Sequence, residues 1–420
     1  MEDIMFRDAI LFGLVGRGNQ LAEAERSLDE LARLLDTAGG SVFARVLQVK
    51  DSPDPRTLIG SGKVREIKEL AEKNQISLAV FDGELSPAQI RNLEDDLGGE
   101  VDVIDRSMLI LDIFALHATS GEGKLQVELA QLRYTAPRLV GHGTELSRLG
   151  GGIGTRGPGE SKLETDRRHM KERITALEKQ IAEMEHNRRV MRAGRDSSGM
   201  IRLALVGYTN AGKSTLLNYL TGAGVLSEDK LFATLDPTTR RLALPMGETV
   251  LLTDTVGFIR KLPHHLVKAF HSTLEEAAYA DILLVVSDAA DPECGEQLAT
   301  TEHTLDDLGA SGKPTIYVMN QCDKLPDFPT GGFRRDGRRI YLSARTGDGI
   351  DLLLTEIESV ISEMKREVTL LLPYAEQGSL SALYSGATVK SVDYEEGGIR
   401  VRVVLDAKQY GRLARYEICE

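Results

Sequence analysis

The eight residues from Gly207 to Ser214 read GYTNAGKS and match the pattern GxxxxGK[ST] of a phosphate-binding loop in full. They follow an apolar run, Ile201–Val206, that predicts a strand, and they precede Thr215–Leu220, which predicts a helix. Glycines in such a loop let backbone N–H groups surround phosphate groups, and the helix N-terminus favours the anion. The chain is therefore expected to contain a doubly wound nucleotide-binding domain.

The chemistry expected of this loop extends to a second motif. Lys213 is expected to reach the β and γ phosphates, and Ser214 is expected to ligate Mg²⁺. The next predicted strand ends in Asp254-Thr-Val-Gly257, which fits the pattern DxxG. In that pattern the carboxylate supports the magnesium ion and the glycine amide contacts the γ phosphate.

Two further motifs indicate which base is bound. Asn320-Gln-Cys-Asp323 and Ser343-Ala-Arg345 each follow an apolar run, and they resemble the NKxD and SAK elements of GTPases. A carboxylate at Asp323 can accept hydrogen bonds from both guanine N1–H and the 2-amino group, which adenine cannot offer. The motif set therefore favours a GTPase over an ATPase or a kinase. Gln321 and Arg345 stand where Lys is commoner, which predicts weaker base stacking with unchanged specificity.

The segment between the phosphate loop and the DxxG motif is expected to close on magnesium when the γ phosphate is present. It runs from Phe232 to Arg240, and Thr234, Thr238 and Thr239 are candidate ligands. Its first four residues resemble the F-x-T-L switch of Obg-like GTPases, which favours Thr234. The residue after DxxG is Phe258, where Ras-like proteins carry a water-orienting Gln, so hydrolysis by the protein alone is expected to be slow.

Asn210 gives the loop the pattern GxxNxGKS, which resembles that of GTPases using K⁺ to neutralise phosphate charge. A monovalent cation between the phosphates can replace an arginine finger electrostatically. A structural Asn that bonds within the loop is the alternative, and the sequence leaves both open.

The candidate site divides into three sets. The expected catalytic residues are Lys213, Asn210 and Thr234. The expected magnesium ligands are Ser214, Thr234 and Asp254. The expected nucleotide-binding residues are Gly207, Tyr208, Thr209, Asn210, Ala211, Gly212, Lys213, Ser214, Thr215, Phe232, Ala233, Thr234, Leu235, Asp236, Asp254, Thr255, Val256, Gly257, Asn320, Gln321, Cys322, Asp323, Ser343, Ala344 and Arg345.

The alternation of apolar runs and helical patterns predicts a multidomain α/β protein. An N-terminal α/β domain is expected over residues 1–115, a helical hairpin over 116–198, the P-loop GTPase domain over 199–366, and a small C-terminal α+β domain over 367–420. The C-terminal α+β domain is expected because two strands, Ala387–Tyr394 and Ile399–Leu405, are predicted on either side of a Glu-Gly-Gly turn.

The hairpin is predicted from heptad spacing and from glycine. Apolar residues recur every seven positions in a long helix beginning near Glu160, as coiled-coil pairing requires: Leu163, Met170, Leu177, Met184 and Met191, with Ile174 and Ile181 at the second seam position. Eight glycines between Gly141 and Gly159 predict a mobile tip, in which Arg148 and Arg156 are the expected RNA contacts. A flexible interdomain linker is the alternative.

Composition limits the class of protein. The net charge is −13, but residues 133–202 hold 15 Lys and Arg against 9 Asp and Glu, so one segment is locally basic. No apolar run is long enough to span a bilayer, and no signal sequence is recognisable, so a cytoplasmic protein is expected. The three cysteines, Cys294, Cys322 and Cys419, form no CxxC pair, which argues against disulfides and zinc.

Three segments outside the nucleotide motifs resemble the HflX family of GTPases. They are Ser107–Phe114 (SMLILDIF), Glu122–Leu132 (EGKLQVELAQL) and Leu149–Arg168 (LGGGIGTRGPGESKLETDRR). Together with the phosphate loop and Phe232–Arg240, the resemblance covers roughly residues 1–366, with Ser161 in place of a commoner Thr. The tail beyond residue 366 resembles a C-terminal extension of some members.

This resemblance implies a GTPase that binds GTP and GDP with Mg²⁺, acts as a monomer, and binds the large ribosomal subunit and its RNA. It implies that GTP binding and hydrolysis help to split or recycle stalled ribosomes, and that ribosomes stimulate the slow hydrolysis. A tRNA-modification GTPase of the TrmE type, suggested by Cys419 near the C-terminus, is the alternative, and a metabolic P-loop enzyme is a third possibility.

Overall fold

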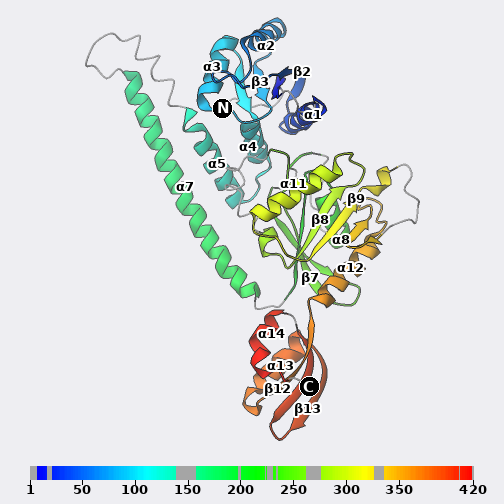
Figure 1. Ribbon diagram of the computed structural model, residues 1–420. Coiled ribbons are helices and arrows are strands. Elements are labelled where there is room, and N and C mark those ends of the chain that lie inside the picture. The colour runs from blue at the N-terminus through cyan, green and yellow to red at the C-terminus, as the bar shows by residue number, and fades with distance from the viewer. Residues whose placement is uncertain are drawn as a thin grey trace.

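The computed structural model of the 420-residue chain describes residues 7–16, 21–138, 158–196, 200–222, 224, 230–232, 235–261, 276–325, 335–405 and 407–418. The described residues form three separate sheets with their helices, and a pair of helices that stands beside them (Figure 1). The multidomain α/β fold expected from the sequence is confirmed.

The first sheet is parallel, with the order β2-β1-β3-β4, and helices cover both of its faces. Alternate residues of β1 point to opposite faces: Ala9 and Leu11 pack with α1 and α4, whereas Ile10 and Phe12 pack with α2 and α3. The elements are β1 (Asp8–Val15), α1 (Leu21–Thr37), β2 (Ser41–Val49), α2 (Ser61–Asn74), β3 (Leu78–Phe81), α3 (Pro87–Leu97), β4 (Asp102–Asp105) and α4 (Arg106–His117).

Helix α4 joins this domain to the nucleotide-binding domain. It is capped by Asp105, whose side chain accepts a hydrogen bond from Met108 N, and its residues from Arg106 to Leu111 are all buried. The apolar cluster that contains α4 also contains Phe232, Val256 and Phe258 of the nucleotide-binding domain. The two domains therefore share one continuous core.

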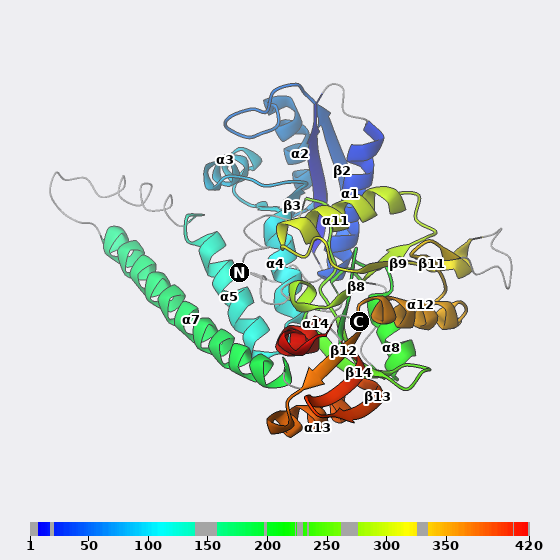
Figure 2. The same ribbon diagram turned by 60° about the horizontal axis from the view of Figure 1, so that its bottom comes forward.

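Helices α5 (Gly121–Thr135) and α7 (Pro158–Asp196) lie side by side and run antiparallel (Figures 1 and 2). Leu129, Leu177 and Ile181 form the centre of their contact, flanked by Leu125, Leu132 and Ile174. Ion pairs across the seam join Arg133 to Glu178, Arg173 to Glu128 and Arg188 to Glu122. Among the seam positions whose side chains the structure describes, Ile174, Leu177 and Ile181 pack against α5, which has 15 residues to the 39 of α7.

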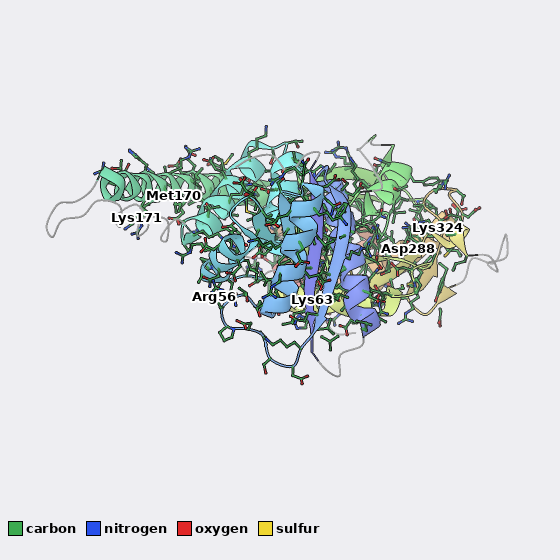
Figure 3. The ribbon with its side chains drawn as sticks, turned by 90° about the horizontal axis from the view of Figure 1, so that it is seen from above. Arg56, Lys63, Met170, Lys171, Asp288 and Lys324 are labelled. Carbon is green, nitrogen blue, oxygen red and sulfur yellow. The ribbon has the colours of Figure 1, made fainter. Side chains whose placement is uncertain are left out.

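The part of α7 around Met170 and Lys171 projects away from the other domains (Figure 3). The loop that joins the two helices, including Arg148 and Arg156, lies outside the described residues, as do the side chains of Leu163 and Met191. The predicted role of that loop stays a prediction.

The second sheet has the order β10-β11-β9-β8-β5-β7-β6 and is parallel except at β6 and β10. The phosphate loop leaves β5 at the carboxyl edge of this sheet and enters α8. The elements are β5 (Arg202–Gly207), α8 (Lys213–Thr221), β6 (Thr238–Ala243), β7 (Thr249–Asp254), β8 (Ile282–Asp288), α11 (Cys294–Asp307), β9 (Thr315–Asn320), β10 (Arg335–Asp336), β11 (Arg339–Tyr341) and α12 (Ile350–Glu363).

The third sheet is antiparallel, with the order β12-β14-β13, and α13 and α14 accompany it. Buried residues of β12 and β14, such as Leu370 and Val401, form its core with Leu383 of α13. The elements are β12 (Arg366–Leu372), α13 (Gln377–Gly386), β13 (Thr388–Glu395), β14 (Gly398–Leu405) and α14 (Ala407–Leu413). Among the described residues of the whole chain, no helix is long and apolar enough to cross a membrane.

Candidate nucleotide-binding site

The phosphate loop wraps around the side chain of Lys213. The Lys213 ammonium donates hydrogen bonds to Gly207 O at 3.1 Å and to Tyr208 O at 2.7 Å, and the residue is buried. Burial lowers the pKa of Lys213 to about 8, and the nearby carboxylate of Asp254 opposes this shift. The cation points into the concave side of the loop, where an anion would neutralise it.

Two of the three expected magnesium ligands lie together. Ser214 Oγ donates a hydrogen bond to Asp254 Oδ2 at 2.7 Å, and Asp254 is fully buried at the end of β7. A hydroxyl and a carboxylate are hard oxygen donors of the kind that Mg²⁺ prefers. Thr234 and Ala233 lie outside the described residues, while Thr238 faces Asp254 in the β6–β7 register.

The DxxG motif is held directly against the phosphate loop. Phe258 N donates to Gly207 O at 3.0 Å, and Thr209 N donates to Phe258 O at 2.8 Å. A Cβ on Gly257 would lie 2.8 Å from Thr209 Cα, so only glycine fits there. The Phe258 ring is buried in the shared core and carries no polar atom with which to orient a water molecule.

The base-side motifs meet at the same edge of the sheet. Asn320 Nδ2 donates to Ala211 O, and Asn320 Oδ1 accepts a hydrogen bond from Ala344 N, both at 2.9 Å. Ser343 Oγ donates to Asp323 Oδ1 at 2.7 Å, which fixes the carboxylate in one orientation. The structure thus brings together all four motifs that the sequence predicted.

Gln321 adopts a left-handed backbone conformation and donates from Nε2 to Asn210 O at 2.9 Å. The uncharged side chain of Gln321 therefore contacts the phosphate loop, and no cation stands at this position of the motif. The nearest Lys in this stretch, Lys324, instead faces Asp288 at 3.8 Å (Figure 3). Burial raises the pKa of Asp288.

The N-terminal domain forms one wall of the site, which no motif in the sequence indicates. Glu30 and Arg33 of α1 line a cavity of about 340 Å³ together with Thr209, Asn210 and Lys324. No sequence signal marks these two residues, because charged positions on an amphipathic helix are usually solvent-exposed.

A buried charge network continues from this wall. Glu30 accepts a hydrogen bond from the Tyr208 hydroxyl and pairs with Arg106, which is 1% exposed. Arg106 also pairs with Asp82 at 2.8 Å, and Lys261 donates to Asp82 at 2.9 Å. Burial by itself raises the pKa of Asp82, but the two cations hold it below the usual value. The phosphate loop and the segment after DxxG are thus both bonded to the N-terminal domain.

Family models match almost the whole chain. Their descriptions are GTP-binding GTPase N-terminal over residues 25–115, GTP-binding GTPase Middle Region over 117–195, 50S ribosome-binding GTPase over 202–321, and HflX C-terminal domain over 334–416.

Curated relatives are similar over their full length. GTPase HflX of Caldanaerobacter subterraneus subsp. tengcongensis is 50% identical, over 94% of this chain and 91% of the relative. GTPase HflX of Escherichia coli is 44% identical, over 93% of this chain and 92% of the relative. A crystal structure of a GTP-binding protein from Sulfolobus solfataricus in complex with GDP is 27% identical, over 85% of this chain and 99% of that chain, with a TM-score of 0.43.

Proposed function

Because this chain belongs to the HflX family of GTPases, which hydrolyse GTP to GDP and phosphate, we propose that it couples this reaction to work on the ribosome. The proposed partner is the large ribosomal subunit with its RNA, and the proposed outcome is the splitting or recycling of stalled ribosomes. The observation that carries the proposal is the arm formed by α5 and α7, which projects away from the other domains around Met170 and Lys171 (Figure 3). Helix α7 belongs to the segment 133–202 of the sequence, in which Lys and Arg outnumber Asp and Glu.

The residue assignments follow from the geometry and are proposals as well. The phosphates are proposed to lie against the loop from Gly207 to Ser214, with Lys213 on the β and γ phosphates. Magnesium is proposed to bind Ser214 and Asp254, with Thr234 joining in the GTP state. The support is the hydrogen bond between Ser214 and Asp254 and the buried ammonium of Lys213 beside them.

The TrmE alternative has no support from the comparisons. The region after the GTPase domain matches the HflX C-terminal domain and forms the sheet β12-β14-β13, where the alternative requires a helical domain. Cys419, which suggested it, lies outside the described residues.

Potassium is expected to stimulate hydrolysis relative to sodium by on the order of tenfold, because a cation held by Asn210 would neutralise charge between the phosphates. Rates are compared in KCl and NaCl at matched ionic strength. The control is Asn210→Gly, which removes the side chain but tolerates the left-handed backbone, where φ is 62°. Equal rates of the unaltered protein in both salts would assign Asn210 a purely structural role.

Replacing the loop between α5 and α7 is expected to weaken ribosome binding without affecting the nucleotide. The variant exchanges residues 141–159 for a short Gly-Ser turn, and a milder one changes Arg148 and Arg156 to Ala. Both are sedimented with large subunits in the presence of a non-hydrolysable GTP analogue. We expect reduced co-sedimentation and a smaller dependence of binding on salt, because two phosphate contacts are lost.

The matched control for this experiment changes Arg338 and Arg339 to Ala, two exposed residues of the nucleotide-binding domain outside the arm, and is expected to leave co-sedimentation unchanged. Binding of GDP by the loop variant is measured in parallel. Unchanged sedimentation and splitting by the loop-replaced protein would reject the role of the loop. Loss of GDP binding would show instead that the loop packs on the GTPase domain.

A further inference from the structure

The segment expected to close on the nucleotide is attached to the N-terminal domain upstream of Thr234. Leu231 N donates to Thr37 Oγ1 of α1 at 3.3 Å. The Phe232 ring packs edge-on against Phe114 of α4, with centroids 4.8 Å apart and planes at 80°. Both Leu231 and Phe232 are buried, so this attachment is part of the shared core.

Downstream of Thr234, the segment is attached to the start of α5 through one carboxylate. Asp236 Oδ2 accepts hydrogen bonds from Thr119 N at 2.9 Å, Thr119 Oγ1 at 2.7 Å and Ser120 N at 2.7 Å, and Oδ1 accepts one from Ser120 Oγ. Ser120 is the N-cap of α5, and its Oγ also accepts a hydrogen bond from Gly123 N. Burial raises the pKa of Asp236, but the hydrogen bonds to its carboxylate outweigh burial and hold the pKa below the usual value.

The first turn of α5 is shaped to admit this carboxylate. A Cβ on Gly123 would lie 2.6 Å from Asp236 Oδ1 and 2.9 Å from Ser120 Oγ. Gly is a poor helix former, so its presence inside the first turn carries a cost that helix stability alone does not explain. Gly121, in the same turn, has open space where its Cβ would be.

We propose that Asp236 is a positioning residue for GTP hydrolysis, and that the first turn of α5, with Gly123, is the receptor for its carboxylate. The inference rests on the proposed assignment of the 232–240 segment as the one that closes on magnesium. Asp236 lies two residues before Thr238, which faces Asp254 across the β6–β7 ladder. The chain that carries Thr234 therefore has one end fixed at Phe232 and the other beside the magnesium carboxylate.

Bonding Asp236 to the first turn of α5 limits the conformations of the backbone that leads to Thr238 and the Asp254 carboxylate, so less entropy is lost when these groups are placed for the reaction. The same contact joins the hydrolytic site to the arm, because Asp236 bonds to the helix that pairs with α7. A partner that displaces α5 would change the position of Asp236 and of the strand that carries Thr238 without touching the nucleotide.

The test uses the full chain without ribosomes, so its result is separate from that of the proposed ribosomal function. Single-turnover GTP hydrolysis is measured for Asp236→Ala, Asp236→Asn, Gly123→Ala and the double variant Gly123→Ala/Asp236→Ala. We expect each Ala variant to lower the rate about 10- to 100-fold, as for a reacting group displaced by about 1 Å. Asp236→Asn keeps one acceptor oxygen, so its hydrolysis rate is expected to lie between those of the unaltered protein and Asp236→Ala. The double variant is expected to be no slower than the slower single variant.

The matched control is Gly121→Ala, which is expected to leave the rate unchanged. GDP affinity is expected to stay within about twofold in all variants, because the contact lies outside the phosphate loop and the base motifs. Gly123→Ala gains helix propensity but displaces the Asp236 carboxylate, and these opposing effects are expected to leave the unfolding temperature within a few degrees of that of the unaltered protein. The proposal would be overturned if Asp236→Ala or Gly123→Ala hydrolysed GTP as fast as the unaltered protein or faster. It would also be overturned if Gly121→Ala and Gly123→Ala lost the same rate, or if the rate losses of the single variants added in the double variant.

Discussion

Asp323→Asn is expected to convert the protein from a GTP-binding to an XTP-binding enzyme. The Asp323 carboxylate is oriented by the Ser343 hydroxyl at 2.7 Å, with both oxygens of the carboxylate suited to accept from guanine donors. An amide at the same position can donate to the 2-oxo group of xanthine, while the guanine amino group loses its acceptor. A site that loses such a pairing typically rejects the former ligand by on the order of 10⁴-fold, so we expect a change of this order in the ratio of GTP to XTP affinity.

The measurement is competition of GTP and XTP for the purified variant, with the unfolding temperature recorded for each protein. Gln321→Lys is the matched control, because it restores a cation beside the base and leaves Asp323 in place. It is expected to tighten GTP and GDP without altering the preference between guanine and xanthine. If Asp323→Asn still prefers GTP while remaining folded, the assignment of Asn320–Asp323 to the base is wrong.

Large ribosomal subunits are expected to accelerate single-turnover GTP hydrolysis by several orders of magnitude. The reason is local: Phe258 occupies the position after DxxG, and its buried ring offers nothing to align an attacking water. A partner must then complete the site or reposition the segment that carries Thr234. For Ras the partner contributes about 10⁵-fold, which sets the scale of the effect.

Rates are compared for the protein alone, with large subunits and with small subunits at the same concentration. The loop-replaced variant described above serves as a second control, since its nucleotide site is unaltered and its stimulation is expected to be lost. A single-turnover rate that large subunits leave unchanged would remove the proposed coupling between hydrolysis and the ribosome.

The nucleotide motifs were predictable because each is local in sequence and ends a strand. Strand β3 and helix α3 are also marked locally in the sequence, the strand by a short buried apolar run and the helix by its Ser-Pro start. The pairing of Ile174, Leu177 and Ile181 with α5 also followed from spacing alone.

Contacts between domains could not be predicted in this way. Helix α4 is buried on most sides, so its apolar residues show little helical periodicity, and its packing against Phe232 depends on a partner more than a hundred residues away. Glu30 and Tyr208 are separated by 178 positions, and neither carries a pattern that points to the other. Asp236 was expected to contact the nucleotide as part of the switch segment, whereas its carboxylate is bonded to α5 in the described structure.

The unequal lengths of α5 and α7 make the arm a lever. At 1.5 Å per residue, the 39 residues of α7 span about 58 Å, against about 22 Å for the 15 residues of α5. The first turn of α5 lies beside Arg188, about 45 Å from the far end of α7, so a tilt of about 5° around that turn would move the far end by roughly 4 Å. A small displacement of the Asp236 carboxylate would thus accompany a larger displacement at the far end of α7. Conversely, a force applied at that end would act more strongly on the carboxylate, because the carboxylate lies close to the pivot.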